Sequence, residues 1–345
     1  YCPLMGKLEG AGMDIRCTQN IYKSANGVTN ISYYILSPVG VGLRGVIQIS
    51  HGVCEYFSRY TAFAKYLCGL GFIVCGNDHL GHGNSAPKSF DIGFFSNKNG
   101  DEALIADVKA LTDIMKARYE HLPYFILGHG MGSLIARLLV SRYPGLFDGC
   151  IVSGTSSAHP ANAVMLRVSN SIVHTKGSTC RSPLLQKMFF GSLLRKIPSP
   201  ETPFDWLSTD RDVVSLFQSD EKCNFLLTAS AFRDLNLLIF SANSIRCIRA
   251  TEKNFPMLFI SGDMDPFGEY GEGVKKTAAL YKKTGGAAVD LVLYKGLRHE
   301  ILNETNKLEV YGDIIRWIEH VLTRRAEEPL HPEDADLPDQ LKFQL

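Results

Sequence analysis

The feature that most constrains this chain is the pentapeptide Gly128-His129-Gly130-Met131-Gly132. Residues 123–127, immediately before it, are typical of a short buried strand, and residues 131–143 carry leucine and isoleucine at helical spacing. Glycines at alternate positions between a strand and a helix indicate a sharp turn with little room for side chains. We therefore expect a strand, a tight turn and a helix over this segment.

The same pentapeptide has the frame G-x-S-x-G of a nucleophile elbow, but Gly130 stands where the attacking serine is needed. Two other interpretations are a chance glycine turn and a phosphate-binding turn of a dinucleotide fold. The dinucleotide fingerprint needs a further glycine where Ser133 stands, and no acidic residue ends a second strand about 20 residues later. The spacing thus favours an elbow whose central residue has no hydroxyl.

Strand-like and helix-like segments alternate along much of the chain. The strand-like segments are residues 28–36, 45–50, 72–76, 124–127, 150–153, 257–261 and 289–294. The helix-like segments are residues 59–70, 101–119, 131–143, 274–283 and 308–324. Such alternation predicts an α/β fold with a mostly parallel sheet and helices on both faces.

Between residues 155 and 254 the alternation gives way to short helical patterns and several prolines, which indicates an inserted helical cap. We expect the core to comprise residues 1–154 and 255–325, followed by an acidic tail over residues 326–345. Residues 156–200 contain six Lys or Arg and no acidic residue, interleaved with Met, Phe and Leu. This composition suits peripheral contact with anionic lipid headgroups, but a solvated basic face is the alternative that we favour slightly.

Two polar loops follow the last two strand-like segments. Gly262-Asp263-Met264-Asp265 follows the first, and His299 ends the loop that follows the second. A serine hydrolase of this topology carries nucleophile, acid and histidine in that chain order. Asp265 is therefore the expected acid, with Asp263 as its rival, and His299 is the expected base. Alone, each of these residues is more typical of a turn or of the surface.

Acyl transfer also needs two backbone N–H groups that face the developing oxyanion. Met131 follows the nucleophile position, and Val53 lies in the loop after the strand-like segment 45–50. We expect these two residues to supply the N–H groups, although His51-Gly52 alone would indicate only a tight turn. Ser133 lies about 4.5 Å further along the helix axis and is not expected to replace the missing nucleophile.

Composition restricts the class of protein further. The formal net charge of +1 gives no support for nucleic-acid binding, and no apolar run reaches the roughly 18 residues of a membrane span. Nine scattered cysteines without a C-x-x-C pair predict reduced thiols in a cytoplasmic protein and disfavour zinc. His79 and His82 lack a further ligand cluster, so we expect neither a metal nor a cofactor.

Several motifs together carry a family resemblance. They are HGVCEYFSRY at residues 51–60, DHLGHGNS at 78–85, the pentapeptide at 128–132, GDMD at 262–265 and GLRH at 296–299. In this order they resemble the monoacylglycerol lipase and lysophospholipase branch of the α/β-hydrolases, over about residues 32–322. The resemblance implies that Gly130 occupies the nucleophile's place, that Asp265 and His299 complete a triad, and that Val53 and Met131 form the oxyanion hole. It also implies a cap over an acyl-binding channel and cleavage of carboxylic esters without a cofactor.

Glycine at position 130 has no oxygen to acylate, so this chain is expected to be nearly inactive by acyl-serine chemistry; loss of such a serine lowers turnover about a millionfold. One interpretation is an engineered replacement in an ester hydrolase, which we favour because the surrounding machinery is all present. The other is a natural protein that binds an acyl or small hydrophobic ligand. The expected partner is a lipid-like monoester; amide, peptide and small ester substrates, and the oligomeric state, stay open.

Overall fold

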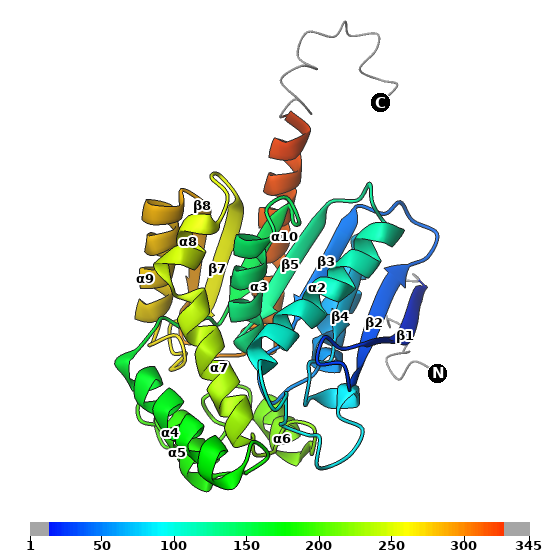
Figure 1. Cartoon of the computed structure of the whole chain (residues 1–345). Helices are drawn as coiled ribbons and strands as arrows, with labels where there is room; N and C mark the ends of the chain where they lie inside the picture. The colour runs from blue at the N-terminus through cyan, green and yellow to red at the C-terminus, as the bar shows by residue number, and fades with distance from the viewer. Residues whose placement is uncertain (1–13, 328–345) are drawn as a thin grey trace, which may run out of the picture.

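The computed structural model describes residues 14–327. Its central element is a single eight-stranded sheet (Figure 1). Its strands follow the order β1-β2-β4-β3-β5-β6-β7-β8. They are β1 (Ile15–Lys23), β2 (Asn30–Pro38), β3 (Gly45–Ser50), β4 (Phe72–Asn77), β5 (Tyr124–His129), β6 (Gly149–Ser153), β7 (Pro256–Gly262) and β8 (Ala288–Tyr294). The β1–β2 and β2–β4 pairings are antiparallel and the other five are parallel, which confirms the predicted fold class.

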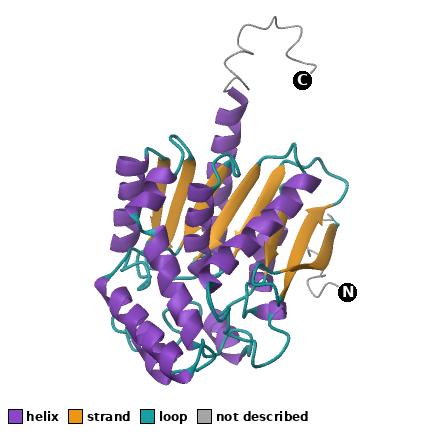
Figure 2. Cartoon of the chain, in the orientation of Figure 1, coloured by secondary structure: helices purple, strands orange, loops and turns teal. Residues whose placement is uncertain are grey.

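Helices cover both faces of the sheet (Figures 1 and 2). The helices outside the β6–β7 connection are α1 (Thr61–Gly69), α2 (Gly100–Arg118), α3 (Met131–Arg142), α9 (Glu272–Leu280) and α10 (Lys307–Glu327). Buried side chains of α1 and α10 belong to one apolar cluster, and those of α2, α3 and α9 belong to the other. Successive strand residues point to opposite faces, so Ile126 packs with the second cluster while Phe125 and Leu127 pack with the first.

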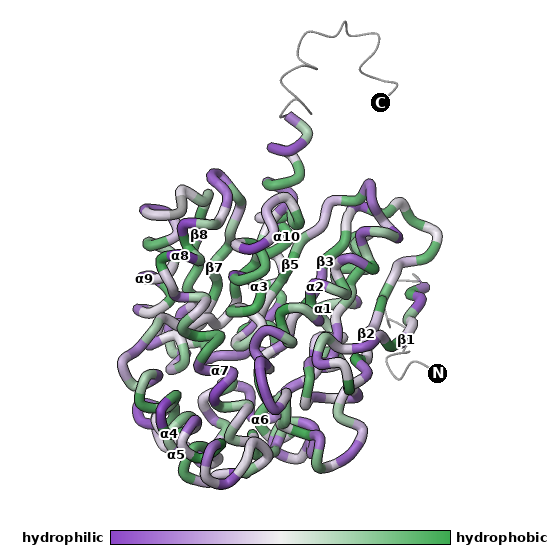
Figure 3. The backbone as a smooth tube through the Cα atoms, in the orientation of Figure 1, coloured by the Kyte–Doolittle hydropathy of each residue, from purple (hydrophilic) through white to green (hydrophobic). Residues whose placement is uncertain are grey.

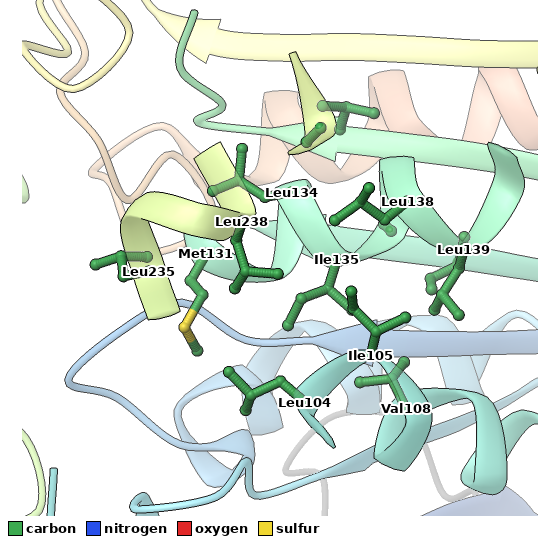
Figure 4. Packing of buried hydrophobic residues seen from close by; sticks show 14 of the residues in the cluster. Leu104, Ile105, Val108, Met131, Leu134, Ile135, Leu138, Leu139, Leu235 and Leu238 are labelled. Atoms are coloured by element: carbon green, nitrogen blue, oxygen red, sulfur yellow. The ribbon is translucent and has the colours of Figure 1, made fainter. Parts of the chain in front are cut away.

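The cluster around α3 fixes the position of the residues that follow the pentapeptide. Leu134, Ile135 and Leu138 of α3 belong to one buried cluster with Leu104 of α2 and Leu238 of the connection, and Ile135 points toward α2 (Figure 4). All five side chains are buried, and the green colour of the strands and of α3 in Figure 3 shows how the apolar residues gather there. Because α3 is held on several sides, the turn that precedes it is held as well.

The long connection between β6 and β7 is helical. It contains α4 (Pro160–Lys176), α5 (Pro183–Phe190), α6 (Arg211–Ser219), α7 (Ala229–Ala242) and α8 (Ile245–Ala250). Helices α4, α5 and α6 gather beyond the carboxyl ends of the parallel strands, and α7 and α8 pack on α3 (Figure 1). Pro160 and Pro183 stand in the first turns of their helices, where a missing N–H costs no hydrogen bond. The predicted domain boundaries at residues 155 and 254 stay a prediction.

The structure differs from the sequence-based expectations in three places. β1 was not expected; it is an edge strand whose Ile21 is exposed, so it lacks the apolar pattern of a buried strand. The helix expected at 274–283 ends at Leu280 and continues as a single π-helical turn (Tyr281–Gly285). The expectation of reduced thiols is wrong for Cys17, which is disulfide-bonded, because sequence spacing does not show which cysteines meet; seven other cysteines are free.

Three further expectations concern the acidic tail, a membrane span and the cellular location. Helix α10 extends to Glu327, and the rest of the predicted acidic tail, residues 328–345, lies outside the described residues. Within residues 14–327, no helix combines the length and apolar character needed to cross a bilayer. The cytoplasmic location stays a prediction.

Arg137 of α3 ties the two ends of the long connection to the core. Its side chain is fully buried and donates hydrogen bonds to the hydroxyl of Thr155 at 3.2 Å and to the carbonyl of Ala242 at 2.7 Å. A further bond reaches the side-chain oxygen of Asn243 at 2.9 Å. Residue 155 begins the connection and residues 242–243 lie near its end, so one guanidinium holds both.

We predict that Arg137→Met lowers the free energy of unfolding by about 3 kcal/mol, because several buried acceptors lose their donor. Arg142→Met on the same helix removes only the exposed ion pair with Glu102 and should cost under about 1 kcal/mol. Urea unfolding of both variants measures the difference. Equal losses would contradict the role given to Arg137.

Candidate active site

The predicted turn is present between β5 and α3. Gly130 has φ +53° and ψ −116°, a conformation that is strained for any residue with a Cβ. A Cβ on Gly128 would lie 2.2 Å from the carbonyl oxygen of Gly132, and one on Gly132 would lie 1.9 Å from that of Ser50. The flanking glycines are therefore required by close backbone approach.

The side-chain direction of residue 130 faces His299. An ideal Cβ on Gly130 lies 3.2 Å from Nε2 of His299 and 3.6 Å from Cα of Gly52. A hydroxyl on that carbon would be within hydrogen-bonding reach of the imidazole after a shift of a few tenths of an ångström. Ser133 is not placed for this role, because its hydroxyl donates to the carbonyl of Gly130 at 2.6 Å.

The loops after β7 and β8 bring an acid and a base together. Nδ1 of His299 lies 2.9 Å from Oδ2 of Asp265, which is fully buried. The same carboxylate accepts hydrogen bonds from the Ser261 hydroxyl at 3.2 Å and from the Phe267 N–H at 2.9 Å. These bonds fix the carboxylate, and the carboxylate fixes the imidazole with Nε2 toward Gly130.

Asp263, the rival acid, has another function. Its Oδ1 accepts a hydrogen bond from the Gly296 N–H at 2.7 Å, which joins the loop after β7 to the loop after β8. The structure thus pairs Asp265 with the imidazole and uses Asp263 to close the adjoining loops.

The imidazole is enclosed by aromatic rings. The ring centroids of His129, Trp206 and Phe267 lie 4.5, 5.0 and 5.4 Å from that of His299. Burial opposes protonation of His299, yet the Asp265 carboxylate and its hydrogen bond outweigh burial and raise the pKa above 6.5. Burial and the neighbouring His299 lower the pKa of His129 well below 6.5, so His129 stays neutral.

Two backbone N–H groups border the same space. Met131 is the first residue of α3, where N–H groups have no acceptor within the helix and the helix dipole favours negative charge. Val53 lies in the loop after β3, and within residues 14–327 neither N–H donates to another backbone carbonyl. Both residues line the cavity above Gly130. That their N–H groups form an oxyanion hole stays a prediction.

A buried ionic network supports the loop that carries Val53. Oε1 of Glu55 accepts hydrogen bonds from the Gly52 N–H at 2.5 Å and from the Tyr60 hydroxyl at 2.7 Å. Arg59 lies 3.3 Å from Glu55 and forms two bonds, of 2.5 and 2.7 Å, with Glu300. Burial raises the pKa of Glu55 to about 7, against the lowering effect of Arg59. The network joins the loop that carries Val53 to Glu300, the residue after His299.

Sequence reasoning assigned no role to Glu55, Arg59 or Glu300. The available signal was a Glu–Arg pair four residues apart, directly after the turn at residues 51–53, and an acidic neighbour of the expected base. Arg59 also lies over the ring of Phe217 in α6, at 4.9 Å from its centroid.

Three buried histidines, His51, His79 and His82, lie next to the loop that carries Val53. Nε2 of His51 accepts the His79 N–H at 2.9 Å, and Nε2 of His82 accepts the Cys54 N–H at 3.0 Å. Burial lowers the pKa of His79 to about 3 and that of His82 to about 4, so both are neutral acceptors or donors in hydrogen bonds. In residues 14–327 no three His, Cys, Asp or Glu side chains are arranged to hold a metal ion.

Two adjoining cavities lead from the cap to residue 130. A cavity of about 20 Å³ is bounded by Gly130, Met131 and His299 among others. A second cavity of about 370 Å³ shares part of its lining with the first; the shared residues are Val53, Phe190, Trp206 and Leu207. The remaining walls of the second cavity are mostly apolar side chains of the cap. A cavity of about 740 Å³ lies elsewhere, at the starts of β7 and β8.

Taken together, the fold and the imidazole–carboxylate pair are those of the serine hydrolase class with the α/β-hydrolase fold, although Gly130 stands at the nucleophile position. Residues 42–306 match the model of the Hydrolase_4 family, described as "Serine aminopeptidase, S33". The chain therefore belongs to this family, within which it is monoacylglycerol lipase-like.

Similar proteins cover most of the chain. The monoacylglycerol lipase of Mycolicibacterium smegmatis is 28% identical over 294 residues, which are 85% of this chain and 94% of that protein. Phospholipase YtpA of Bacillus subtilis is 28% identical over 273 residues, 77% of this chain and 92% of that protein. The structure of a thermostable carboxyl esterase from Bacillus coagulans, in complex with glycerol, superimposes with a TM-score of 0.84 at 29% identity, covering 88% of this chain and 98% of that one.

The glycines of the turn should respond differently to alanine. We predict that Gly132→Ala lowers the free energy of unfolding by about 3 kcal/mol or more, because its Cβ meets the backbone of β3. Gly130→Ala needs only a shift of the His299 side chain by a few tenths of an ångström, so its main cost is the strain of its positive φ, about 1–2 kcal/mol. Denaturant midpoints of the two variants check this order. A larger loss for Gly130→Ala would contradict the described geometry.

Proposed function

We propose that this chain binds a lipid-like carboxylic monoester, of the monoacylglycerol or lysophospholipid type, in the site of an acyl-serine hydrolase whose nucleophile position holds glycine. The observation that carries the proposal is the 3.2 Å between an ideal Cβ on Gly130 and Nε2 of His299, with Asp265 bonded to the other ring nitrogen. That arrangement is the one needed to take a proton from a hydroxyl at position 130.

The substrate class follows from the second cavity. Its mostly apolar walls suit an acyl chain, and the residues that it shares with the smaller cavity bring the ester end of such a chain to Gly130. The relatives named as a monoacylglycerol lipase and a phospholipase support lipid esters over peptides. The ester carbonyl would accept hydrogen bonds from the N–H groups of Val53 and Met131.

In a serine-bearing form, each group has a defined part in the reaction. His299 takes the proton of the serine hydroxyl and later activates water, while Asp265 holds the imidazole in the required tautomer. The tetrahedral oxyanion is stabilised by Val53 and Met131, and no step needs a cofactor. Gly130 removes the covalent step from this chain while leaving the binding site in place.

Two origins of Gly130 are compatible with this proposal. The intact groups around it support a deliberate replacement of serine in an active hydrolase, and this is the origin that we favour. The alternative is a natural binder of acyl or small hydrophobic ligands; it is supported by the backbone at residue 130, because its positive φ suits glycine better than serine.

The cap also carries features that suit a lipid source of substrate. Val164 and Leu184 are more than half exposed, and Arg167, Lys187 and Lys196 are exposed on the same helical segments or just beyond them. Apolar and cationic side chains together favour peripheral contact with an anionic lipid surface. This contact would place the opening of the second cavity near its substrate.

Restoring the hydroxyl tests the proposed function. We predict that Gly130→Ser hydrolyses p-nitrophenyl esters with an acyl-enzyme burst, at least about a thousandfold faster than the chain with glycine. Turnover should increase from acetate to octanoate, because longer chains occupy the apolar cavity. A folded Gly130→Ser variant without turnover would favour the non-catalytic binder.

The two aspartates after β7 provide a matched pair. In the Gly130→Ser background, Asp265→Asn should lower kcat about 10⁴-fold, because the imidazole loses the carboxylate that fixes its tautomer. Asp263→Asn should leave kcat close to that of its parent, since the Asp263 carboxylate accepts from the Gly296 N–H of the neighbouring loop, whereas the imidazole is bonded to Asp265. Steady-state kinetics of both variants decide between them; a loss confined to Asp263→Asn would reverse the assignment of the acid.

A further inference from the structure

We propose that this chain, as it stands with Gly130, hydrolyses activated esters by direct attack of water, with His299 as the base and with no acyl-enzyme. The inference rests on the proposed ester site but concerns a different reaction path. It uses the groups that surround residue 130 and needs no protein nucleophile.

The cavity above Gly130 is large enough to hold water. The centre of a water-sized sphere can be placed throughout a volume of about 20 Å³ there, and the lining includes polar groups that a buried water needs as partners. A Cβ at residue 130 would take part of this space, 3.2 Å from Nε2 of His299. With glycine the same space is open to a water bonded to Nε2 and lying beside the N–H groups of Val53 and Met131.

The imidazole is prepared to accept a proton from that water. Because Nδ1 bonds to Asp265 at 2.9 Å, the proton of the neutral ring lies on Nδ1 and the lone pair of Nε2 faces the cavity. The same carboxylate favours the imidazolium that forms when the water loses its proton. His299 therefore meets the geometric requirement of a general base, which is hydrogen-bond reach to the proton that it removes.

The reaction balances without any further reactant. The water oxygen attacks the acyl carbon while its proton passes to Nε2 of His299, and the carbonyl oxygen becomes an oxyanion held by Val53 and Met131. Collapse of this intermediate breaks the bond to the leaving oxygen, and the imidazolium proton is returned to the products. One ester and one water give one acid and one alcohol.

Protein groups near the cavity are poorly suited to replace water as the nucleophile. The residues that line it include no Ser, Thr, Lys or Cys. Cys54, in the adjoining cavity, is buried, and burial raises the pKa of its thiol far above neutrality, so the reactive thiolate is absent. Glu55 and Glu300 line the cavity, but Glu55 accepts from Gly52 and Tyr60, and Glu300 is bonded twice to Arg59.

The test compares four proteins on p-nitrophenyl butyrate and octanoate: the chain itself, Gly130→Ala, Gly130→Ser and His299→Gln. We expect the chain to exceed the solvent rate by about a thousandfold without a burst. Gly130→Ala should be at least about tenfold slower, because its methyl group takes the water's place. His299→Gln should be at least about a hundredfold slower, because it loses the general base and keeps only the binding site and the two N–H groups. Gly130→Ser is the matched control for Gly130→Ala, because both substitutions place a Cβ on the same strained backbone and differ only in the hydroxyl.

Two further readouts identify the path. A fluorophosphonate probe should label and inactivate Gly130→Ser but leave the turnover of the glycine chain unchanged, which also excludes a contaminating serine esterase. The rate of the glycine chain should fall as the pH drops through the pKa of His299, because only the neutral imidazole is a base. That pKa lies above 6.5, so the loss begins at a higher pH than for an ordinary histidine.

The outcomes separate this inference from the proposed function. If Gly130→Ser turns over the esters but the glycine chain is no faster than Gly130→Ala or His299→Gln, direct attack by water is overturned. The proposed ester site is still supported by that result. No turnover by a folded Gly130→Ser overturns the proposed function itself. Inactivation of the glycine chain by the fluorophosphonate shows a protein nucleophile and likewise overturns the inference.

Discussion

The contact between the turn at residue 130 and the end of β3 is the constraint on which the site depends. Gly132 lies so close to the carbonyl of Ser50 that no side chain fits between them. This approach sets the start of α3 against the loop that carries Val53, so the two N–H groups and the side-chain direction of residue 130 are placed by one backbone packing arrangement. The imidazole, brought by the loop after β8, three strands further along the chain, then meets a fixed partner.

Much of this arrangement could be predicted because it depends on residues that are close together in the sequence. The buried strands are short apolar runs, the turn is marked by alternating glycines, and the acid and the base each lie in a loop within five residues of the end of a strand. Parallel strands place their carboxyl ends at one edge of the sheet, so chain order alone brings Asp265 and His299 to the side where Gly130 lies. The family resemblance adds the order of the motifs, but the convergence has a physical cause.

Other parts could not be predicted, because they depend on contacts between distant residues. Asp263 and Asp265 are two positions apart, and only the observed hydrogen bonds tell the loop-closing carboxylate from the one that holds the imidazole. Arg59 and Glu300 are separated by 241 positions, so their pairing leaves no local signal. β1 was missed because an edge strand needs no continuous apolar pattern, and Cys17 because pairing depends on spatial proximity.

Arg59 connects the cap to the two loops that carry Val53 and His299. Its guanidinium bonds Glu55 behind the first of these loops and Glu300 beside the base, and its flat face rests on Phe217 of α6. A displacement of α6 must either break that stacking or pull on both loops at once. The width of the larger cavity, which Phe217 lines, is thereby linked to the packing of the loops that carry Val53 and His299.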